Sequence, residues 1–205
     1  AWMLCLSENS YMAECAVLAS GSGSNFEAVV RGLEGTGHRV SCLVSDNDQA
    51  YAVVRAQSLR IPWHVVKYSS TGKPDNDRRH AEERILEILK QYKPCLLVLA
   101  GFMRLLTPTF VDCFPRRIVN IHPALLPKFP GTHGLTESYR SGDAELGITI
   151  HLVDYVMDTG PVLLQRSFKR KGTETLKEIE DRIHALEHQC YPSVIIGQLD
   201  SCGEA

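Results

Sequence analysis

Residues 96–100 form an unbroken apolar run, Leu-Leu-Val-Leu-Ala, between Pro94 and Gly101. A strand with one face in water alternates apolar and polar side chains, whereas a strand covered on both faces is apolar throughout. Fully covered strands are typical of parallel sheets that carry helices on both faces. This run therefore predicts a helix-covered, mostly parallel sheet.

Segments of strand and helix character alternate around this run. Strands are expected at 15–20, 40–45, 64–66, 96–100 and 117–121, and helices at 26–33, 49–59, 77–92 and 108–113. After Gly147 two strands follow each other, at 148–153 and 161–168, before a helix at 173–190 with Thr173 as its N-cap. The order predicts an α/β fold with a doubly wound, mostly parallel sheet whose C-terminal strands are partly antiparallel.

Composition narrows the functional classes. The net charge is −2 and no long basic run occurs, so a nucleic acid is not expected as a partner. No apolar stretch approaches the ~18 residues of a membrane span. The seven cysteines include no CxxC pair and no cluster with metal-ligand spacing, which favours reduced thiols, a cytoplasmic location and no metal. Residues 1–14 are interpreted as an N-terminal extension or an expression remnant, and 15–205 as one domain.

The strongest chemical signal is Asn-x-His at the end of the strand at 117–121. Residues two apart in a strand point to the same face, so Asn120 and His122 share a face where the strand gives way to a loop. An amide donor beside an imidazole suits the stabilisation of an oxyanion and the transfer of a proton. Taken alone, the pair also fits a capped strand end with a buried histidine.

A glycine-rich loop, residues 21–25 (GSGSN), joins the first strand to the first helix. Exposed N–H groups and the helix dipole favour an anion there. A dinucleotide fingerprint needs a third glycine, but position 26 is Phe, although Asp46 lies where a ribose-binding acid would stand. A phosphomonoester site fits better, and a glycine-rich turn capped by Ser24 or Asn25 is the structural alternative.

Further polar segments follow two other strands. Gly101 and Arg104 come after the buried run, and Arg104 is suited to a carboxylate or a polar heterocycle. Asp154 and Asp158 follow the strand at 148–153, where a carboxylate would stabilise an imidazolium at His122. Ligands bind at the carboxyl ends of strands in open α/β sheets, so the four segments together predict one site.

With these segments in order, the chain resembles the glycinamide ribonucleotide formyltransferases of the formyltransferase family. The resemblance covers about residues 15–192, and its most specific pieces are SGSGSN at 20–25, LAGFMRLL at 99–106, NIHPALLPKFPG at 120–131 and MDTGPVLLQ at 157–165. It implies a Rossmann-like domain that moves a formyl group from 10-formyltetrahydrofolate to the amine of 5-phosphoribosylglycinamide in purine biosynthesis. Both substrates are small molecules, and a monomer or a homodimer is expected.

The resemblance also implies roles for individual residues. The implied catalytic residues are Asn120, His122 and Asp158; the implied phosphate-binding residues are Gly23, Ser24 and Asn25, with Glu187 as a further substrate contact; and the implied folate contacts are Arg78, Met103, Arg104, Leu105, Leu106 and Asp154. His184 stands where relatives often carry glutamine. Read without the resemblance, Arg78 is most simply solvent-facing, and His184 with Glu187 a surface pair.

Four other functions remain as alternatives. Formyltetrahydrofolate deformylase, a hydrolase, is the closest, but it usually carries an extra N-terminal domain and has less need of a phosphate loop. Methionyl-tRNA formyltransferase would bring an RNA-binding domain and a basic surface. A non-catalytic nucleotide- or folate-binding module has no use for Asn120, His122 and Asp158 together, and an NAD-dependent dehydrogenase needs the missing glycine.

Overall fold

The computed structural model describes residues 12–68 and 74–203. Most of the extension predicted over 1–14 lies outside these ranges. In chain order the elements are β1 (Glu14–Leu18), α1 (Ser24–Gly32), β2 (Arg39–Ser45), α2 (Tyr51–Ser58), β3 (Trp63–Val65), α3 (Pro74–Tyr92), β4 (Leu96–Leu99), α4 (Pro108–Asp112), β5 (Ile118–His122), α5 (Gly134–Ser141), β6 (Glu145–Leu152), β7 (Val162–Lys169) and α6 (Leu176–Ser201).

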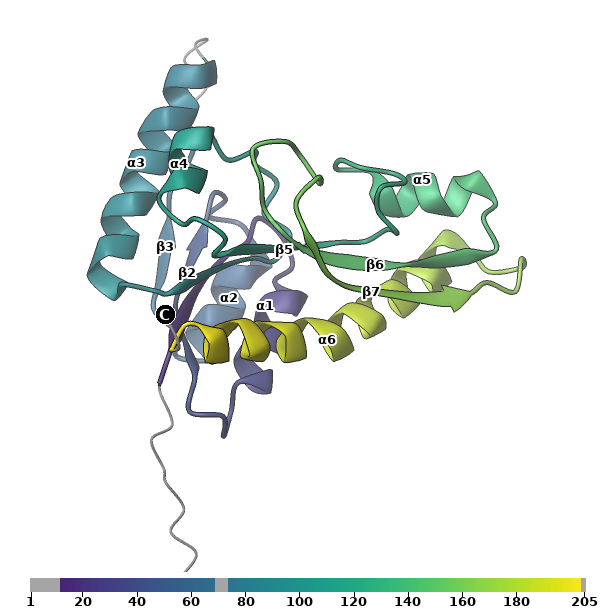
Figure 1. Cartoon of the computed structure of the whole chain (residues 1–205), viewed down its shortest axis with the longest axis horizontal. Coiled ribbons are helices and arrows are strands. Elements are labelled where there is room, and N and C mark those ends of the chain that lie inside the picture. The colour runs from purple at the N-terminus through teal and green to yellow at the C-terminus, as the bar shows by residue number, and fades with distance from the viewer. Residues whose placement is uncertain (1–11, 69–73, 204–205) are drawn as a thin grey trace, which may run out of the picture.

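The strands form one sheet in the order β3-β2-β1-β4-β5-β6-β7. Strands β1 to β5 run parallel, while β6 is antiparallel to both of its neighbours. Long β6 and β7 extend away from the parallel half, with α5 beside them (Figure 1). The mixed, doubly wound sheet predicted from the sequence is confirmed.

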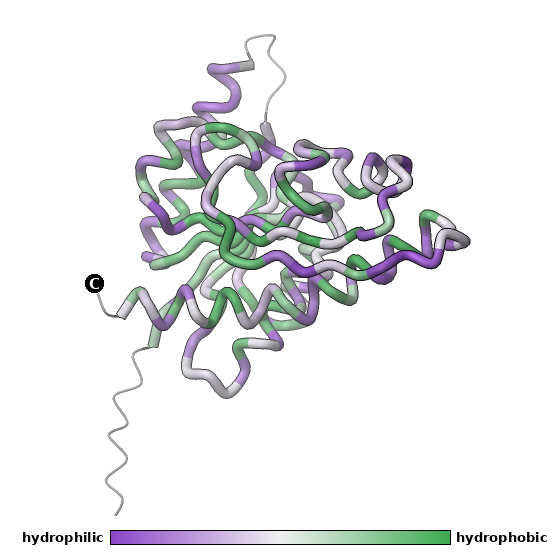
Figure 2. Tube along the Cα trace, turned by 45° about the vertical axis from the view of Figure 1, so that its right-hand side comes forward, coloured by the Kyte–Doolittle hydropathy of each residue, from purple (hydrophilic) through white to green (hydrophobic). Residues whose placement is uncertain are grey.

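Both faces of the sheet are covered, as the apolar runs predict. In β1, Cys15 and Val17 belong to the core beneath α1, α2 and α6, whereas Ala16 and Leu18 belong to the core beneath α3 and α4. Hydrophobic residues accordingly gather along the central strands, and hydrophilic ones lie on the outer turns of the helices (Figure 2). The alternation of faces at period 2 explains why no residue of β4 is polar.

The C-terminal part departs from the prediction in three ways. Helix α5 was not expected, and α6 extends to Ser201 with Pro192 inside it. The N-cap is Thr175 rather than Thr173, because Thr175 and Glu178 form a reciprocal capping box. Pro192 packs closely on α1: a Cβ added at Gly32 would lie 2.4 Å from the Pro192 Cβ.

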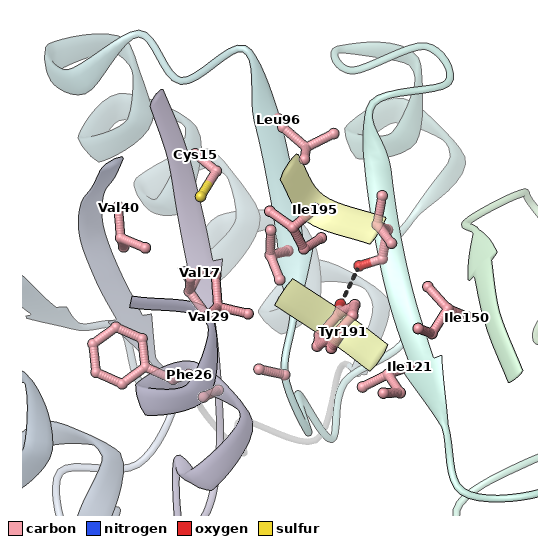
Figure 3. Close-up of a cluster of buried hydrophobic side chains, with 14 of the residues drawn as sticks. Cys15, Val17, Phe26, Val29, Val40, Leu96, Ile121, Ile150, Tyr191 and Ile195 are labelled. Atoms are coloured by element: carbon pink, nitrogen blue, oxygen red, sulfur yellow. Dashed lines mark hydrogen bonds between the residues drawn. The ribbon is translucent and has the colours of Figure 1, made fainter. Parts of the chain in front are cut away.

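Tyr191 ties α6 to the middle of the sheet. It is fully buried beneath the central strands (Figure 3). Its hydroxyl lies 2.9 Å from the Leu99 carbonyl oxygen in β4 and 3.0 Å from that of Val119 in β5. These two strands end in the loop carrying Arg104 and in His122 respectively. The packing of α6 therefore fixes the strands that carry the site predicted from the sequence.

The strand order reverses between β1 and β4, which opens a crevice between the loops that follow them. The two loops are joined by hydrogen bonds from Ser20 N–H to the Gly101 carbonyl (3.1 Å) and from Met103 N–H to the Ser20 hydroxyl (2.8 Å). The glycine-rich loop and the segment after the buried strand thus lie side by side at the switch point.

Candidate active site

A cavity of about 230 Å³ lies beside this crevice at the carboxyl ends of β4 and β5. Its walls come from four segments of the sequence: residues 99–106, 120–123, 131–132, and 151–158 at the end of β6 and in the connection to β7. Asn120, His122 and Asp158 all line it, together with Met103, Arg104, Leu105, Leu106 and Asp154. The structure therefore brings these eight residues together in one cavity.

Strand register brings a further histidine to the cavity. Asn120 in β5 pairs directly with His151 in β6, and the Asn120 amide Nδ2 lies 3.2 Å from His151 Nε2. His151 Nδ1 lies 2.9 Å from the Leu152 carbonyl oxygen, which can only accept, so Nδ1 carries the proton of the neutral ring. In the neutral ring Nε2 accepts from Asn120, whose second N–H has no partner among the described residues and can serve a ligand. In the charged ring the Nε2–H faces Asp158 Oδ1 at 3.5 Å.

The orientation of His122 follows from the loop after β5. Its Nε2 donates to the Phe129 carbonyl oxygen at 2.7 Å, and Phe129 has a left-handed backbone conformation, with φ of 55°. The other ring nitrogen, Nδ1, faces the Asp158 carboxylate at 3.5 Å. The ring is buried. Because Nε2 is engaged by the Phe129 carbonyl, Nδ1 is the atom with which His122 can serve a substrate.

Asp158 is held between two histidines. Its Oδ2 accepts from Gly131 N–H at 2.7 Å and faces His122, while Oδ1 lies 3.5 Å from His151 Nε2. Burial alone raises the pKa of this carboxyl, but His151, the Gly131 N–H and the charge of His122 together outweigh it. The pKa of Asp158 therefore lies below its ordinary value of 3.8, and the carboxylate is charged at neutral pH.

A second cavity, of about 310 Å³, lies over the glycine-rich loop. Gly23, Ser24 and Asn25 line it with Glu187 and His184 of α6. Gly23 has φ of 72°, and a Cβ there would lie 2.6 Å from the Ala52 Cα, so the loop conformation requires glycine. The residues predicted to bind phosphate are brought together.

Glu187 is buried, which corrects its interpretation as part of a surface pair. Asn25 Nδ2 donates to the Glu187 carboxylate at 2.9 Å, and this bond joins α1 to α6. Burial raises the pKa of Glu187, and the Asn25 amide and the charge of His184 offset only part of that rise. The ring of His184 stacks on His188, with centroids 6.3 Å apart.

The two cavities adjoin, because Gly101, Met103, Ile121 and Pro123 line both of them. Asn120, His122 and Asp158 stand on the side of the first cavity, and the glycine-rich loop belongs to the second. The arrangement offers two neighbouring subsites: the amide and the imidazole flank the shared Ile121 on the side of the first, and the acid faces that imidazole.

Arg78 and Asp46 are placed differently from their predictions. Arg78 lies near the start of α3, half-buried, and does not line either of these cavities; its charge acts on Tyr68 and Glu82. Asp46 is not a free ribose-binding acid, since its carboxylate accepts from Arg104 Nε at 2.6 Å. Across residues 12–68 and 74–203, no cluster of three or more His, Cys, Asp or Glu side chains could hold a metal ion.

Three features of the site were missed by sequence reasoning. They are the His151 imidazole, the Phe129 carbonyl and the Gly131 N–H, which orient Asn120, His122 and Asp158 respectively. Pairing of β5 with β6 was the available signal for His151, because it fixes which residue stands opposite Asn120. The two backbone groups carry no sequence signal.

Comparison with known proteins agrees with this geometry. The formyl transferase family profile matches residues 13–195. Phosphoribosylglycinamide formyltransferase of Bacillus subtilis (strain 168) is 41% identical over 186 residues, covering 90% of this chain and 93% of the relative. The enzyme of that name from Escherichia coli (strain K12) is 36% identical over 185 residues, covering 87% of this chain and 84% of the relative.

Solved structures give the same result for the fold. The crystal structure of glycinamide ribonucleotide transformylase 1 from Geobacillus kaustophilus superposes with a TM-score of 0.84 at 40% identity, covering 92% of this chain and all of that one. Phosphoribosylglycinamide formyltransferase from Bacillus halodurans gives a TM-score of 0.84 at 34% identity, covering 91% and 95%. The chain belongs to the formyl transferase family.

Proposed function

We propose that this protein transfers a formyl group from 10-formyltetrahydrofolate to the primary amine of 5-phosphoribosylglycinamide, a step of purine biosynthesis. The observation that carries the proposal is the junction of two subsites. A formyl transfer needs its donor and its acceptor side by side, and the two adjoining cavities share Gly101, Met103, Ile121 and Pro123, while Asn120, His122 and Asp158 line the first. Relatives that bear the name of this activity cover most of the chain.

The acceptor fits the second cavity. Its phosphate is assigned to the backbone N–H groups and side chains of Gly23, Ser24 and Asn25, where the N-terminus of α1 favours negative charge. Glu187 is assigned to the sugar, since a buried carboxyl already held by Asn25 can accept or donate to hydroxyls. This placement directs the amine of the acceptor toward the junction.

The formyl folate fits the first cavity. Met103, Leu105 and Leu106 supply apolar wall, and backbone groups of this segment are available for the polar edge of a pterin ring. Arg104 supplies a cation for the carboxylates of the folate tail, and Arg78 stands near Tyr68 on the same side. Asp154 closes the cavity from the β6–β7 connection.

The chemistry follows from the free atoms of the three catalytic residues. As the amine nitrogen bonds to the formyl carbon, the carbonyl oxygen becomes an oxyanion, to which the free Asn120 N–H and a protonated His122 Nδ1 donate. Asp158 stabilises that imidazolium from 3.5 Å. The carbon then loses its bond to N10 of the folate, and the proton lost by the amine is delivered to N10 through Asp158 or a water that it orders.

Hydrolysis by a formyltetrahydrofolate deformylase is the alternative reaction for the same folate. Hydrolysis uses no amine acceptor, so no substrate would fill the second cavity. The relatives that cover this chain are named as transferases. The test is the absorbance change that accompanies conversion of 10-formyltetrahydrofolate to tetrahydrofolate, with and without phosphoribosylglycinamide. Conversion that depends on the amine supports the transferase; conversion at the same rate without it overturns the proposal.

A further inference from the structure

One buried acid at the site has no part in the chemistry described above. Asp46 directly follows β2, and its side chain is only 4% exposed. Its Oδ2 accepts from Arg104 Nε at 2.6 Å. Its Oδ1 is also buried, and no hydrogen-bond partner for it occurs among the described residues. A buried carboxylate that uses one oxygen for a single arginine and leaves the other unpaired costs stability, which directs attention to what it does for that arginine.

Arg104 is constrained from a second direction. Its guanidinium lies over the ring of Tyr68, with the Cζ atom 4.9 Å from the ring centroid. Tyr68 is in turn braced edge-on by Phe102, with ring centroids 6.4 Å apart, and Phe102 is buried in the core beneath α3 and α4. The Asp46 hydrogen bond to Nε limits rotation of the guanidinium within its own plane, and the Tyr68 ring beneath it limits its tilt.

The contacts with Asp46 and Tyr68 leave the two Nη groups of Arg104 available to a ligand. Nε uses one of the five N–H donors of a guanidinium, and within the described part of the chain no acceptor is hydrogen-bonded to either Nη. The Arg104 side chain remains 45% exposed and lines the cavity assigned to the folate. Four donors in a fixed fork match the two oxygens of a carboxylate.

We propose that Asp46, with Tyr68, is a positioning residue for the folate: the pair holds Arg104 with its Nη groups toward the carboxylates of the glutamate tail. The inference rests on the proposed function, because it assigns the first cavity to a formyl folate. Asp46 touches no reacting atom and acts through Arg104. It therefore affects how tightly the tail binds, not the transfer of the formyl group.

The test compares two co-substrates that differ only in the tail, 10-formyltetrahydrofolate and 10-formyltetrahydropteroate, which lacks the glutamate. In Asp46→Ala, the KM for the glutamate-bearing co-substrate is expected to rise about tenfold, which is 1.4 kcal/mol at 25 °C, with kcat unchanged. The KM for the pteroate form is expected to stay within about twofold of the wild-type value. Asp46→Asn keeps an oxygen acceptor for Nε and is expected to recover part of the loss.

Matched variants separate positioning from a general effect on the fold. Asp48→Ala removes an acid two residues away that is exposed and paired with Lys67 at 2.6 Å, and it is expected to change neither KM. Tyr68→Leu removes the ring beneath the guanidinium and is expected to raise the KM selectively, as Asp46→Ala does, whereas Tyr68→Phe keeps the ring and is expected to leave it unchanged.

Equal increases in KM for the two co-substrates in Asp46→Ala would show that the acid only supports the structure, and would overturn the inference while leaving the transferase intact. An unchanged KM for the glutamate-bearing form would also overturn it. Absence of turnover with either co-substrate in the wild-type protein would remove the proposed function, and the positioning role with it. Selective loss for the glutamate-bearing form is the result that supports the inference.

Discussion

The carboxylate of Asp158 lies 3.5 Å from Nδ1 of His122, although the two residues are 36 positions apart in the sequence, on β5 and on the β6–β7 connection. Because Nε2 of His122 is engaged by the Phe129 carbonyl, the side facing Asp158 is the only side from which this ring can exchange a proton with a substrate. The proposed transfer depends on this relationship.

Replacing Asp158 by Asn tests that dependence. The amide keeps the shape of the carboxylate but removes the charge beside the imidazole, so kcat is expected to fall about 10²–10⁴-fold, the usual contribution of a positioned acid–base group. Steady-state rates at saturating substrates measure the loss, and circular dichroism checks the fold. Asp143→Asn removes a partly exposed acid paired with Lys128 and is the control, expected to keep the wild-type kcat.

Replacing Asn120 by Ala removes one oxyanion donor. The expected loss in kcat is about 10²-fold, or ~3 kcal/mol of transition-state stabilisation, with little change in KM. A loss confined to KM would contradict the assignment, because it would place the amide in ground-state binding. Asn76→Ala, at an exposed position on α3, serves as the control and is expected to leave both constants unchanged.

Glu187 gives the protein a pH dependence of stability. Its pKa is raised in the folded state, so the folded protein binds more protons than the unfolded chain between the ordinary value of 4.5 and the raised value. The stability associated with the protonated carboxyl is fully present below pH 4.5 and is lost as the pH rises through the raised pKa.

Glu187→Gln keeps an acceptor for Asn25 and cannot ionise, so it is expected to be stabilised relative to wild type, by more at pH 8 than at pH 5. Urea unfolding at the two pH values measures the difference. Glu180→Gln, at a more exposed position on the same helix, provides the comparison and is expected to show a much smaller dependence. A Glu187→Gln difference that is equal at both pH values would contradict the raised pKa of Glu187.

Tyr191→Phe tests the link between α6 and the sheet. It leaves the Leu99 and Val119 carbonyl groups without their shared buried donor and is expected to cost about 1–3 kcal/mol in the free energy of unfolding. Tyr155→Phe also removes a hydroxyl, one that donates to Asp112 on the surface, and is expected to cost much less. Equal losses in the two variants would contradict the anchoring role of Tyr191.

Much of the fold was predictable because it depends on local pattern. Apolar runs such as residues 96–100 indicated doubly covered strands, and the order of strands and helices indicated a mostly parallel sheet; both were confirmed. Helix α5 was missed, because Gly134 begins it, glycine is a poor helix former, and its first turn packs closely on the His122 ring. The length of α6 was underestimated because Pro192 normally ends a helix, and here it packs on Gly32.

For the site, residue types at strand ends indicated which side chains meet, but not what orients them. Asn120, His122 and Asp158 were identified from the sequence and do meet, while His151 became apparent only from the pairing of β5 with β6. The partners of Glu187 and Arg104 lie 162 and 58 residues away, at Asn25 and Asp46. Such long-range contacts depend on the whole packing, so local patterns do not predict them.

The most direct test of the central claim follows the formyl carbon itself. With 10-formyltetrahydrofolate labelled with ¹³C in the formyl group, NMR spectroscopy of the purified protein with phosphoribosylglycinamide should show the label appearing in the amide of the formylated product. One label should appear for each tetrahydrofolate released, and no product should form without the amine. Appearance of the label as free formate at the same rate, with or without the amine, would contradict the proposal.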